Sequence, residues 1–317
     1  MRARLIINPV SGDAEPNTEK IDRIREALAG AKFSLEIVPT TPENSASDLA
    51  QQAVREGIEN VLVGGGDGTV GEVARALVNT GLNLGIIPFG TYNNVARSLS
   101  IPSELEDACR IIVEHRIRTI DVGLANDTLP FLEAAGAGLD AALFPLGEEI
   151  KSGRWHQLVQ FFRLTFQYRA TPFQITFDRP LGEAVPPHRH RKYSARRLQQ
   201  RTLRRRALFI VVANGPYYGS GFTVAPGAVL DDGLFTVAIY RDFSKWELIR
   251  HFQSIYLGKR HYSTKIETFL AAEVRLEGKQ SIPTHIDGQP IGTTPLVLRT
   301  LPAALRVIVP GDSQVKA

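Results

Sequence analysis

Short apolar runs and segments of helical spacing alternate over the first third of the chain. The apolar runs predict strands at residues 4–7, 33–38, 61–63 and 84–88. The segments between them predict helices at 21–28, 47–57 and 70–79, and a further helix follows residue 94. Strands that alternate with helices in this way are typical of a parallel sheet covered on both faces. The pattern therefore predicts a doubly wound, mostly parallel α/β domain over residues 1–124.

The pattern becomes rich in strands after residue 124. Apolar or alternating runs predict strands at 173–177, 207–213, 234–240, 273–276 and 295–298, whereas helical spacing is clear only at 155–168 and 245–257. A second, β-rich and sandwich-like domain is therefore predicted over 125–297. The last apolar run, 304–310, predicts one more strand, which could return to either domain.

A glycine cluster ends the third predicted strand and opens the third predicted helix. It reads Gly64-Gly65-Gly66-Asp67-Gly68-Thr69. Glycines let backbone N–H groups approach an anion closely, and the start of a helix adds a favourable partial charge, so the layout is typical of phosphate binding. A carboxylate at Asp67 repels phosphate unless Mg²⁺ bridges the two. The same residues also suit a tight strand-to-helix turn with an aspartate cap.

Polar residues also follow the neighbouring strands. A loop at residues 90–94 comes after the fourth strand, and Asn8 and Thr40 or Thr41 end the first two strands. The carboxyl ends of parallel strands share one edge of a sheet, where ligands bind. Each residue alone suits a turn or a cap, but together they predict a cleft. The glycine spacing excludes the Walker P-loop and the Rossmann fingerprint.

Composition narrows the class of protein. The 317 residues are 43% hydrophobic, yet no run approaches the roughly 20 apolar residues that a membrane-spanning helix needs. The apolar stretch at the N-terminus is too short for a signal peptide. The single cysteine, Cys109, excludes an internal disulfide framework and suits a reducing compartment, so a cytoplasmic protein is expected.

Positive charge is concentrated in one segment. Between Arg189 and Arg206 there are nine Lys or Arg residues and no acid, so the rest of a chain of net charge +4 is mildly acidic. The segment lies in a stretch, 186–206, that is predicted to be a hairpin excursion between two strands. An anionic membrane surface is the expected partner, and nucleic acid is not, because the block lacks an aromatic stacking pattern. A solvated hairpin tip without a specific role is the alternative.

The order of these and several later segments resembles the catalytic family of diacylglycerol kinases, which includes bacterial lipid kinases and sphingosine kinases and is distantly similar to NAD kinases. The resemblance covers nearly the whole chain. An Ala-Pro…Leu-Asp-Asp-Gly segment separates the family from NAD kinases. The segments that carry the resemblance are residues 8–12, 65–69, 88–91, 120–123, 136–141, 225–233 and 287–290.

The resemblance implies a two-domain lipid kinase of phospholipid metabolism, with ATP in the cleft between an N-terminal nucleotide-binding domain and a β-rich lipid domain. Residues from about 298 to 317 would return to the first domain, and a homodimer is expected because relatives are often dimers. The residues implied to contact the nucleotide are Asn8, Thr40, Thr41, Gly65, Gly66, Asp67, Gly68, Thr69, Val70, Gly71 and Thr91.

Two magnesium sites are also implied by the resemblance. Asp67 and Asp121 would belong to the acidic network around a catalytic Mg²⁺. Asp232, with the backbone carbonyls of Val229 and Leu234, would bind a structural Mg²⁺, since oxygen ligands suit a hard cation. Asp232 also fits a plain turn in Asp-Asp-Gly.

The chain departs from the family pattern where acids are expected. Asn94 stands in place of an aspartate of the magnesium network, and Asp13 replaces the customary lysine after Ser-Gly. Gln289 stands in place of the glutamate regarded as the base for the acceptor hydroxyl. A glutamine amide does not accept a proton at neutral pH. Asp287, two residues earlier, could substitute if it faces the cleft, although it also fits a plain Asp-Gly turn.

Three hypotheses on function follow. The first is an ATP- and Mg²⁺-dependent lipid kinase that acts on diacylglycerol or a related lipid alcohol, because magnesium and positioning account for most of the rate of phosphoryl transfer. The second is a catalytically impaired protein that binds nucleotide and lipid, on the ground of Asn94 and Gln289. The third, a kinase for a soluble alcohol or a nucleotide, is disfavoured by the basic block.

Overall fold

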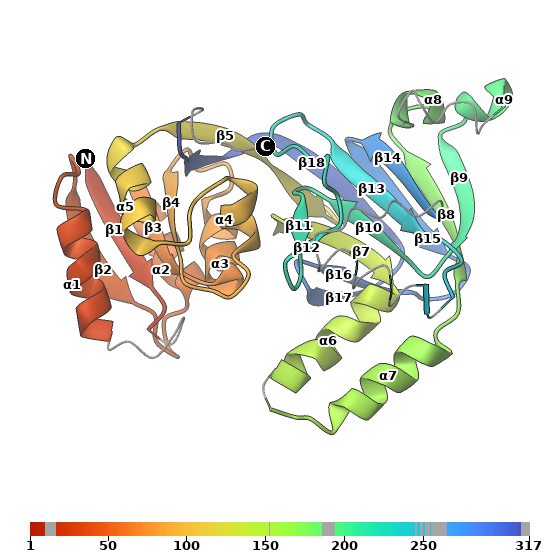
Figure 1. Ribbon diagram of the computed structural model, residues 1–317. Coiled ribbons are helices and arrows are strands. Elements are labelled where there is room, and N and C mark those ends of the chain that lie inside the picture. The colour runs from red at the N-terminus through yellow and green to blue at the C-terminus, as the bar shows by residue number, and fades with distance from the viewer. Residues whose placement is uncertain are drawn as a thin grey trace. The chain divides into compact units, whose positions relative to one another are not determined.

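Figure 1 shows the computed structural model of the chain, which describes residues 1–9, 17–151, 153–185, 194–244, 246, 247, 250, 254 and 265–311. The chain forms two compact units. Unit 1 comprises Met1–Val122 with Pro302–Ala317, and unit 2 comprises Gly123–Leu301. Two strands, β5 (Ile117–Ala125) and β18 (Leu296–Ile308), run from one unit into the other.

Unit 1 is built around a parallel sheet. Its strands lie in the order β2-β1-β3-β4-β18, and every neighbouring pair in this series is parallel. The sequence in β3 and β4 is buried along its whole length, which explains why these strands read as continuous apolar runs. The first four strands are β1 (Arg2–Ile7), β2 (Ser34–Pro39), β3 (Asn60–Gly65) and β4 (Asn83–Pro88).

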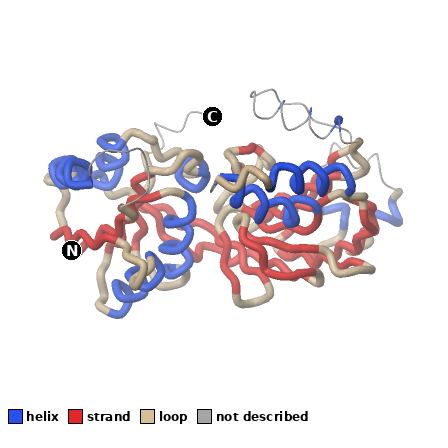
Figure 2. The backbone as a smooth tube through the Cα atoms, turned by 90° about the horizontal axis from the view of Figure 1, so that it is seen from below, coloured by secondary structure: helices blue, strands red, loops and turns tan. Residues whose placement is uncertain are grey.

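Helices cover both faces of this sheet. One pair packs as α1 with α5 and another as α2 with α3, on opposite sides of the strands (Figures 1 and 2). The start of α2 is fixed by a reciprocal capping box between Ser45 and Asp48. The helices of unit 1 are α1 (Asn17–Ala27), α2 (Ala46–Arg55), α3 (Asp67–Leu77), α4 (Asn94–Ser98) and α5 (Leu105–Glu114).

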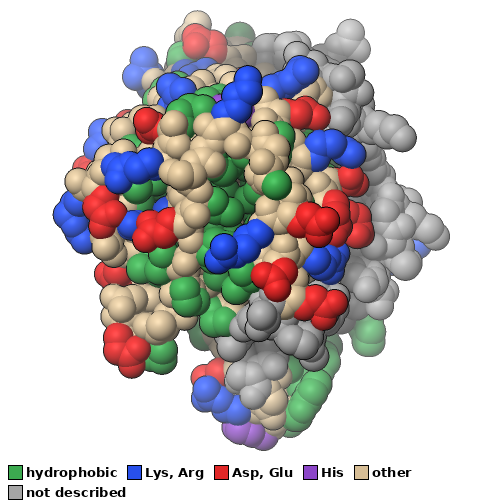
Figure 3. All heavy atoms as spheres, turned by 90° about the vertical axis from the view of Figure 1, so that its left-hand side faces the viewer, with side chains coloured by type: hydrophobic (Ala, Val, Ile, Leu, Met, Phe, Trp, Pro, Cys, Tyr) green, Lys and Arg blue, Asp and Glu red, His purple; other side chains and the backbone are tan. Residues whose placement is uncertain are grey.

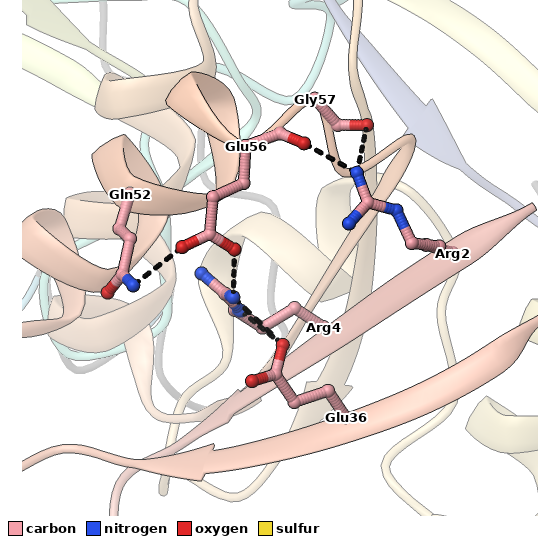
Figure 4. A network of polar contacts seen from close by, with 6 residues as sticks. All are labelled: Arg2, Arg4, Glu36, Gln52, Glu56 and Gly57. Atoms are coloured by element: carbon pink, nitrogen blue, oxygen red, sulfur yellow. Dashed lines mark hydrogen bonds and ion pairs between the residues drawn. The ribbon is translucent and has the colours of Figure 1, made fainter.

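A buried arginine ties the outer strands of unit 1 to α2 (Figure 4). Arg4 on β1 is 3% exposed and lies between the carboxylates of Glu36 and Glu56, at 2.8 and 2.5 Å. Gln52 donates a further hydrogen bond to Glu56, and this contact, followed by the one from Arg4, lowers the pKa of that carboxyl. Pairing on both sides of the guanidinium offsets the cost of burying its charge.

The C-terminal strand completes the sheet of unit 1. Arg306 and Val307 of β18 pair with Asn83 and Leu84 of β4, which confirms the fold-class prediction of a returning strand. The sequence pattern predicts two short strands here, at 295–298 and 304–310, whereas the structure has one. The difference arises at Pro302 and Ala303, where Ala303 adopts a φ of 51° and the alternation of buried and exposed positions changes phase.

Unit 2 is a sandwich of antiparallel sheets, as predicted. One sheet has the order β14-β13-β10-β7-β16-β17, and the other has the order β18-β15-β8-β9. A single core cluster takes side chains from both sheets, such as Phe173 and Phe235. The strands are β6 (Leu129–Phe131), β7 (Ala134–Gly138), β8 (Thr171–Phe177), β9 (Thr202–Ala207), β10 (Phe209–Ala213), β11 (Tyr217–Tyr218), β12 (Phe222–Thr223), β13 (Phe235–Tyr240), β14 (Ile266–Ala271), β15 (Glu273–Gly278), β16 (Pro283–Ile286) and β17 (Gln289–Thr293).

A helical hairpin covers the outer face of the six-stranded sheet. Helices α6 (Leu139–Lys151) and α7 (Gln157–Gln167) pack together, and Leu143 and Leu164 join a second apolar cluster around Phe209 and Tyr240. Figure 2 shows the pair running over the strands of unit 2. The sequence predicts α7 but not α6, because Pro145 interrupts the helical pattern of α6.

Two one-turn helices, α8 (Leu181–Ala184) and α9 (Ala195–Leu198), lie between β8 and β9. The predicted helix at 245–257 lies for the most part outside the described residues. In the part of the chain that the structure describes, no helix combines the length and apolar character needed to cross a membrane.

Candidate active site

The first glycine loop forms an open helix start. β3 ends at Gly65, Gly66 has extended backbone angles, and α3 begins at Asp67 with no side-chain cap. A Cβ atom added at Gly68 would meet nothing within 4 Å, so the space beside the loop is open. The first N–H groups of an uncapped helix are ready donors for an anion.

The second glycine loop packs directly against the first. A Cβ atom added at Gly90 would lie 2.7 Å from the Cα of Gly66, and one at Gly66 would lie 3.3 Å from the Cα of Gly90. The second loop is held in shape by Asn93, whose side chain accepts from Gly90 N at 2.8 Å and donates to Gly90 O at 2.6 Å. Only glycine allows two backbones to approach this closely, so the two loops form one surface at the carboxyl edge of the sheet.

The other residues predicted at this edge divide into two groups. Asn8 joins the glycine loops, because its backbone donates to Gly64 O at 3.0 Å and its amide donates to the hydroxyl of Thr69 at 3.2 Å. Thr40 pairs with Ile7 at the end of β2, whereas the hydroxyl of Thr41 accepts from Asn44 N in the turn before α2. The structure thus gives Thr41 a local role in a turn.

Three more of the residues predicted to contact the nucleotide differ in how far they are exposed to solvent. Thr91 is exposed on the second loop, while the side chain of Val70 is buried in the core under α3. Gly71 leaves room for Arg75, since a Cβ atom there would lie 2.9 Å from its guanidinium. Val70 and Gly71 therefore support α3 from within, and any contact they make with a nucleotide falls to their backbone.

The two acids predicted for the catalytic metal lie in different surroundings. Asp67 is half-buried at the start of α3, and its Oδ1 accepts from Val95 N in α4 at 3.4 Å. Asp121 is 4% exposed on β5, and its Oδ1 accepts from Ala303 N of the C-terminal strand at 2.8 Å. Asn94, beside Val95, is 1% exposed. Both carboxylates thus accept a backbone hydrogen bond, but Asp121 is buried on β5 whereas Asp67 lies at the uncapped start of α3.

A preassembled cluster of acids is absent from the described residues: no group of three or more His, Cys, Asp or Glu side chains could hold a metal there. Mg²⁺ commonly keeps several waters and binds through one or two carboxylates together with the phosphates of the substrate. A single carboxylate beside an uncapped helix start fits that ion. The donor set around Asp67 is thus compatible with Mg²⁺ that arrives with a nucleotide.

The Asp-Asp-Gly segment of unit 2 forms a turn before β13. The Oδ1 of Asp232 accepts from Leu234 N at 2.9 Å, and Gly233 has a φ of 73°. Val229 is 44% exposed. This is the geometry of an Asx turn, and the metal site predicted from Val229, Asp232 and Leu234 stays a prediction.

Asp287 is used by the fold at the turn between β16 and β17. Its Oδ2 accepts from Leu132 N at 3.0 Å, and its Oδ1 accepts from Glu133 N and Ala134 N at 2.9 and 3.2 Å. Its own N–H donates to Ala134 O at 2.8 Å. With both oxygens facing backbone donors, the side chain anchors this turn and is poorly placed to accept a substrate proton. Gln289 follows at the exposed start of β17.

A buried polar cluster supports the same turn. The Nε2 of His285 lies 2.8 Å from the hydroxyl of Tyr218 and 3.2 Å from Oδ2 of Asp140. Burial, followed by the charge of Asp140, raises the pKa of Tyr218 well above its usual value. The ring of Phe144 packs on His285, and a Cβ atom at Gly288 would lie 3.2 Å from that ring.

Sequence reasoning missed this cluster, because its three polar members come from β16, β11 and α6. One signal was present in the sequence. Gly136 is required here, since a Cβ atom at that position would lie 2.6 Å from Nε2 of His285 and 2.7 Å from Oδ2 of Asp140. A glycine inside a strand, opposite a histidine, indicates a close approach of a side chain.

Comparison with known proteins agrees with this arrangement. The family model of the diacylglycerol kinase catalytic domain matches residues 2–125, and the model of the YegS C-terminal NAD kinase beta sandwich-like domain matches residues 162–309. The chain belongs to the diacylglycerol kinase catalytic family.

Two relatives of this chain match it over nearly their whole length. A protein of Chromohalobacter salexigens named "Probable lipid kinase YegS-like" is 27% identical over 98% of this chain and 93% of its own. A diacylglycerol kinase of Staphylococcus aureus is 26% identical with the same coverage. A solved structure of a diacylglycerol kinase from Bacillus anthracis, 22% identical, covers 99% of this chain and 98% of its own with a TM-score of 0.73, which shows a shared fold.

In this family member, the last residues of the basic block, Arg189–Arg206, belong to strand β9 of the sandwich. The predicted excursion ends at β9, where Leu203 is 1% exposed and is followed by three arginines. Arg205 lies 2.9 Å from Glu267, and Arg206 donates to Ala170 O at 2.7 Å. Part of the charge is therefore neutralised within unit 2.

The remaining described arginines of the block are exposed. Arg197, Arg201 and Arg204 line an open hollow of about 580 Å³ with Gln200 and Thr202. Residues 189–193 lie outside the described residues. On the face of unit 1 that Figure 3 presents, by contrast, acidic and basic side chains are interspersed.

Proposed function

We propose that this chain transfers the γ-phosphate of ATP, with Mg²⁺, to the hydroxyl group of diacylglycerol or a related lipid alcohol. The observation that carries the proposal is the contact between the two glycine loops, Gly66 against Gly90, at the uncapped start of α3. Membership in a kinase family and relatives that are named lipid kinases support it.

In this proposal, the residues of unit 1 bind and orient the nucleotide. The N–H groups at the start of α3 and the hydroxyl of Thr69, which Asn8 holds in place, face the phosphates. Asp67 would hold Mg²⁺, and Asp121 would belong to the same network. When bound, the ion would neutralise charge on the transferred phosphoryl group.

The acceptor side depends on unit 2. The turn with Gln289 at its end is held by Asp287 and by the cluster under Phe144. Neither residue is suited to take the hydroxyl proton, since one is an amide and the other is bonded to backbone N–H groups. We infer a kinase that relies on positioning and electrostatics and works without strong base assistance, as a loose transition state permits.

The proposal also includes a place of action and a partner. The protein would work in the cytoplasm as a peripheral protein at the inner membrane surface, which the lone buried cysteine supports. Exposed arginines of the block, such as Arg196, Arg197 and Arg201, would contribute attraction to anionic lipid at about 1 kcal/mol each.

A second candidate is a catalytically impaired protein that binds nucleotide and lipid. The observations that favour it are Asn94 beside the Asp67 contact and Gln289 on the acceptor turn. This candidate predicts ATP binding without phosphate transfer.

Transfer of labelled γ-phosphate from ATP to a panel of lipid alcohols, in the presence of Mg²⁺, separates the two. Transfer to one lipid class that is lost in Asp67→Ala is the expected result. ATP binding with no transfer to any member of the panel would refute the kinase and support the second candidate.

A further inference from the structure

Helix α7 has two apolar faces, of which only one is used by the fold. Leu164 packs with Tyr168 on the inner side against the second core cluster of unit 2. The outer side carries a second set of large apolar residues, and no residue of α7 is buried. This outer set comprises Trp155, Val159, Phe162 and Phe166, with exposed fractions of 67, 75, 53 and 46%.

The outer residues form a continuous stripe. Val159, Phe162 and Phe166 are spaced by three and four positions, which places them on one side of α7. Trp155 lies in the turn just before the helix begins at Gln157. Figure 1 shows α7 at the outer edge of unit 2. Single exposed apolar residues are normal on protein surfaces, but a contiguous stripe indicates an interaction site.

The charged side chains of the segment that carries the stripe are all basic. The chain from Gly153 to Ala170 contains Arg154, Arg163 and Arg169 and no Asp or Glu. Arg154 lies 3.7 Å from Glu149, whereas neither Arg163 nor Arg169 forms a salt bridge with any described residue. An apolar stripe with a cationic rim complements a bilayer with anionic headgroups, because the aromatic rings and arginines both lie at headgroup depth.

We propose that the outer face of α7, together with Trp155, docks on an anionic lipid bilayer and inserts its aromatic side chains into the headgroup region. The role of this contact, to bring the chain to a lipid substrate, rests on the proposed function. The basic block supplies charge alone, whereas α7 supplies apolar insertion, and stable peripheral binding takes two such signals.

The two tryptophans of the chain allow a direct test. Trp155 lies on the stripe, and Trp246 is an equally exposed tryptophan elsewhere, at 76%. Trp246→Phe leaves Trp155 as the only reporter, and Trp155→Phe leaves Trp246. Each variant is mixed, without ATP, with vesicles of phosphatidylglycerol and phosphatidylcholine, with and without brominated acyl chains. We expect a blue shift and quenching for Trp155 and neither for Trp246. Quenching of Trp246 alone would overturn the proposal.

Binding measurements test the stripe and its rim separately. Phe162→Ser/Phe166→Ser should weaken co-sedimentation with these vesicles by on the order of tenfold or more. The control Ile117→Ser/Leu129→Ser, which changes two other exposed apolar residues, should have little effect. Arg163→Gln should weaken binding about fivefold at low salt and less at high salt. Unchanged vesicle binding in the phenylalanine variant, or loss of a homodimer with vesicle binding intact, would contradict lipid docking.

Activity in two substrate forms separates this proposal from the proposed function. The phenylalanine variant should lose phosphate transfer to lipid in vesicles but keep it when the lipid alcohol is dissolved in detergent micelles. If the native chain transfers no phosphate in micelles yet binds vesicles through α7, the proposed function fails and docking stands. If it transfers phosphate in micelles and the α7 variants bind vesicles normally, docking fails and the kinase stands.

Discussion

Asp67 in unit 1 and Asp287 in unit 2 each stand before a glycine, but the structure surrounds the two carboxylates differently. Asp67 in unit 1 is half-buried at an uncapped helix start and accepts a long hydrogen bond, 3.4 Å, from Val95. Asp287 in unit 2 accepts three backbone hydrogen bonds of 2.9 to 3.2 Å. The same dipeptide thus occurs in two different surroundings, which fit a role in the fold for Asp287 and the proposed metal-binding role for Asp67.

The largest expected effect is on catalysis through Asp67. Asp67→Ala should lower the rate of phosphate transfer by about 10²–10³-fold or more, because it removes the proposed metal-binding carboxylate. The free energy of unfolding should change by less than about 1 kcal/mol. Transfer of labelled phosphate and urea denaturation measure the two quantities. If Asp67→Ala transferred phosphate at the native rate, the proposed difference in role between Asp67 and Asp287 would be wrong.

The converse is expected at Asp287. Asp287→Ala should lower the free energy of unfolding by about 3 kcal/mol, since it leaves three backbone N–H groups without their acceptor. Asp287→Asn should lose less, because its amide oxygen still accepts. Urea denaturation monitored by circular dichroism measures the loss. A stable Asp287→Ala protein without transfer activity would instead identify Asp287 as the missing base.

A gain of activity is expected at Gln289, two residues after Asp287, and it tests whether this turn lacks a base. Gln289→Glu should raise the transfer rate by about 10- to 10²-fold, because it introduces a carboxylate at an exposed strand start. The oxygens of Asp287, two residues earlier, accept backbone hydrogen bonds. The rate should then depend on the ionisation of that carboxylate in a pH profile. Gln289→Ala is the control. No gain in Gln289→Glu, with ATP binding intact, would mean that base assistance does not limit the reaction.

The smallest expected effect is a loss of stability at alkaline pH, to which one buried group in each unit contributes. Burial raises the pKa of Cys109 in unit 1 from 9.0 to about 12, and burial, followed by the charge of Asp140, raises that of Tyr168 in unit 2 from 10.0 to about 12. Above pH 9 the unfolded chain binds fewer protons than the folded one, so stability falls as pH rises towards 12.

Between pH 8 and pH 10 the expected loss is about 1 kcal/mol, mostly from the cysteine. Thermal unfolding across this range measures it. Cys109→Ala should flatten the slope from pH 9, whereas Tyr168→Phe should flatten it only above pH 10. Identical slopes in both variants would show that neither group contributes.

The sequence was sufficient for the parallel sheet and for the place of the glycine loops. Apolar periodicity is local, and strand ends in a parallel sheet converge by geometry, so Asn8 and Gly66 could be predicted to share an edge. The role of Asp287 could not be predicted in this way. Its partners are backbone N–H groups 153 to 155 residues earlier, and backbone donors have no signature in the sequence.

The same limit applies to charge and to side-chain clusters. The arginines at 204–206 look equivalent to the rest of the block in the sequence, and only the contact between Arg205 and Glu267 of β14 shows that one of them is paired. His285, Asp140 and Tyr218 meet only because three distant elements pack together. The apolar residues of the exposed stripe on α7 recur with the same helical period as those of a buried helix face. Only the packing around α7 shows that this face is exposed.

The long strand β18 has a consequence for biosynthesis. Its segment from Pro302 onward belongs to unit 1 and pairs with β4, so the sheet of unit 1 is complete only after the residues of unit 2 have been synthesised. Until then the nascent sheet presents an unprotected edge at β4, which is a site for mispairing. A chain cut or stalled before Pro302 would keep the glycine loops but leave the sheet that carries them without this neighbour of β4.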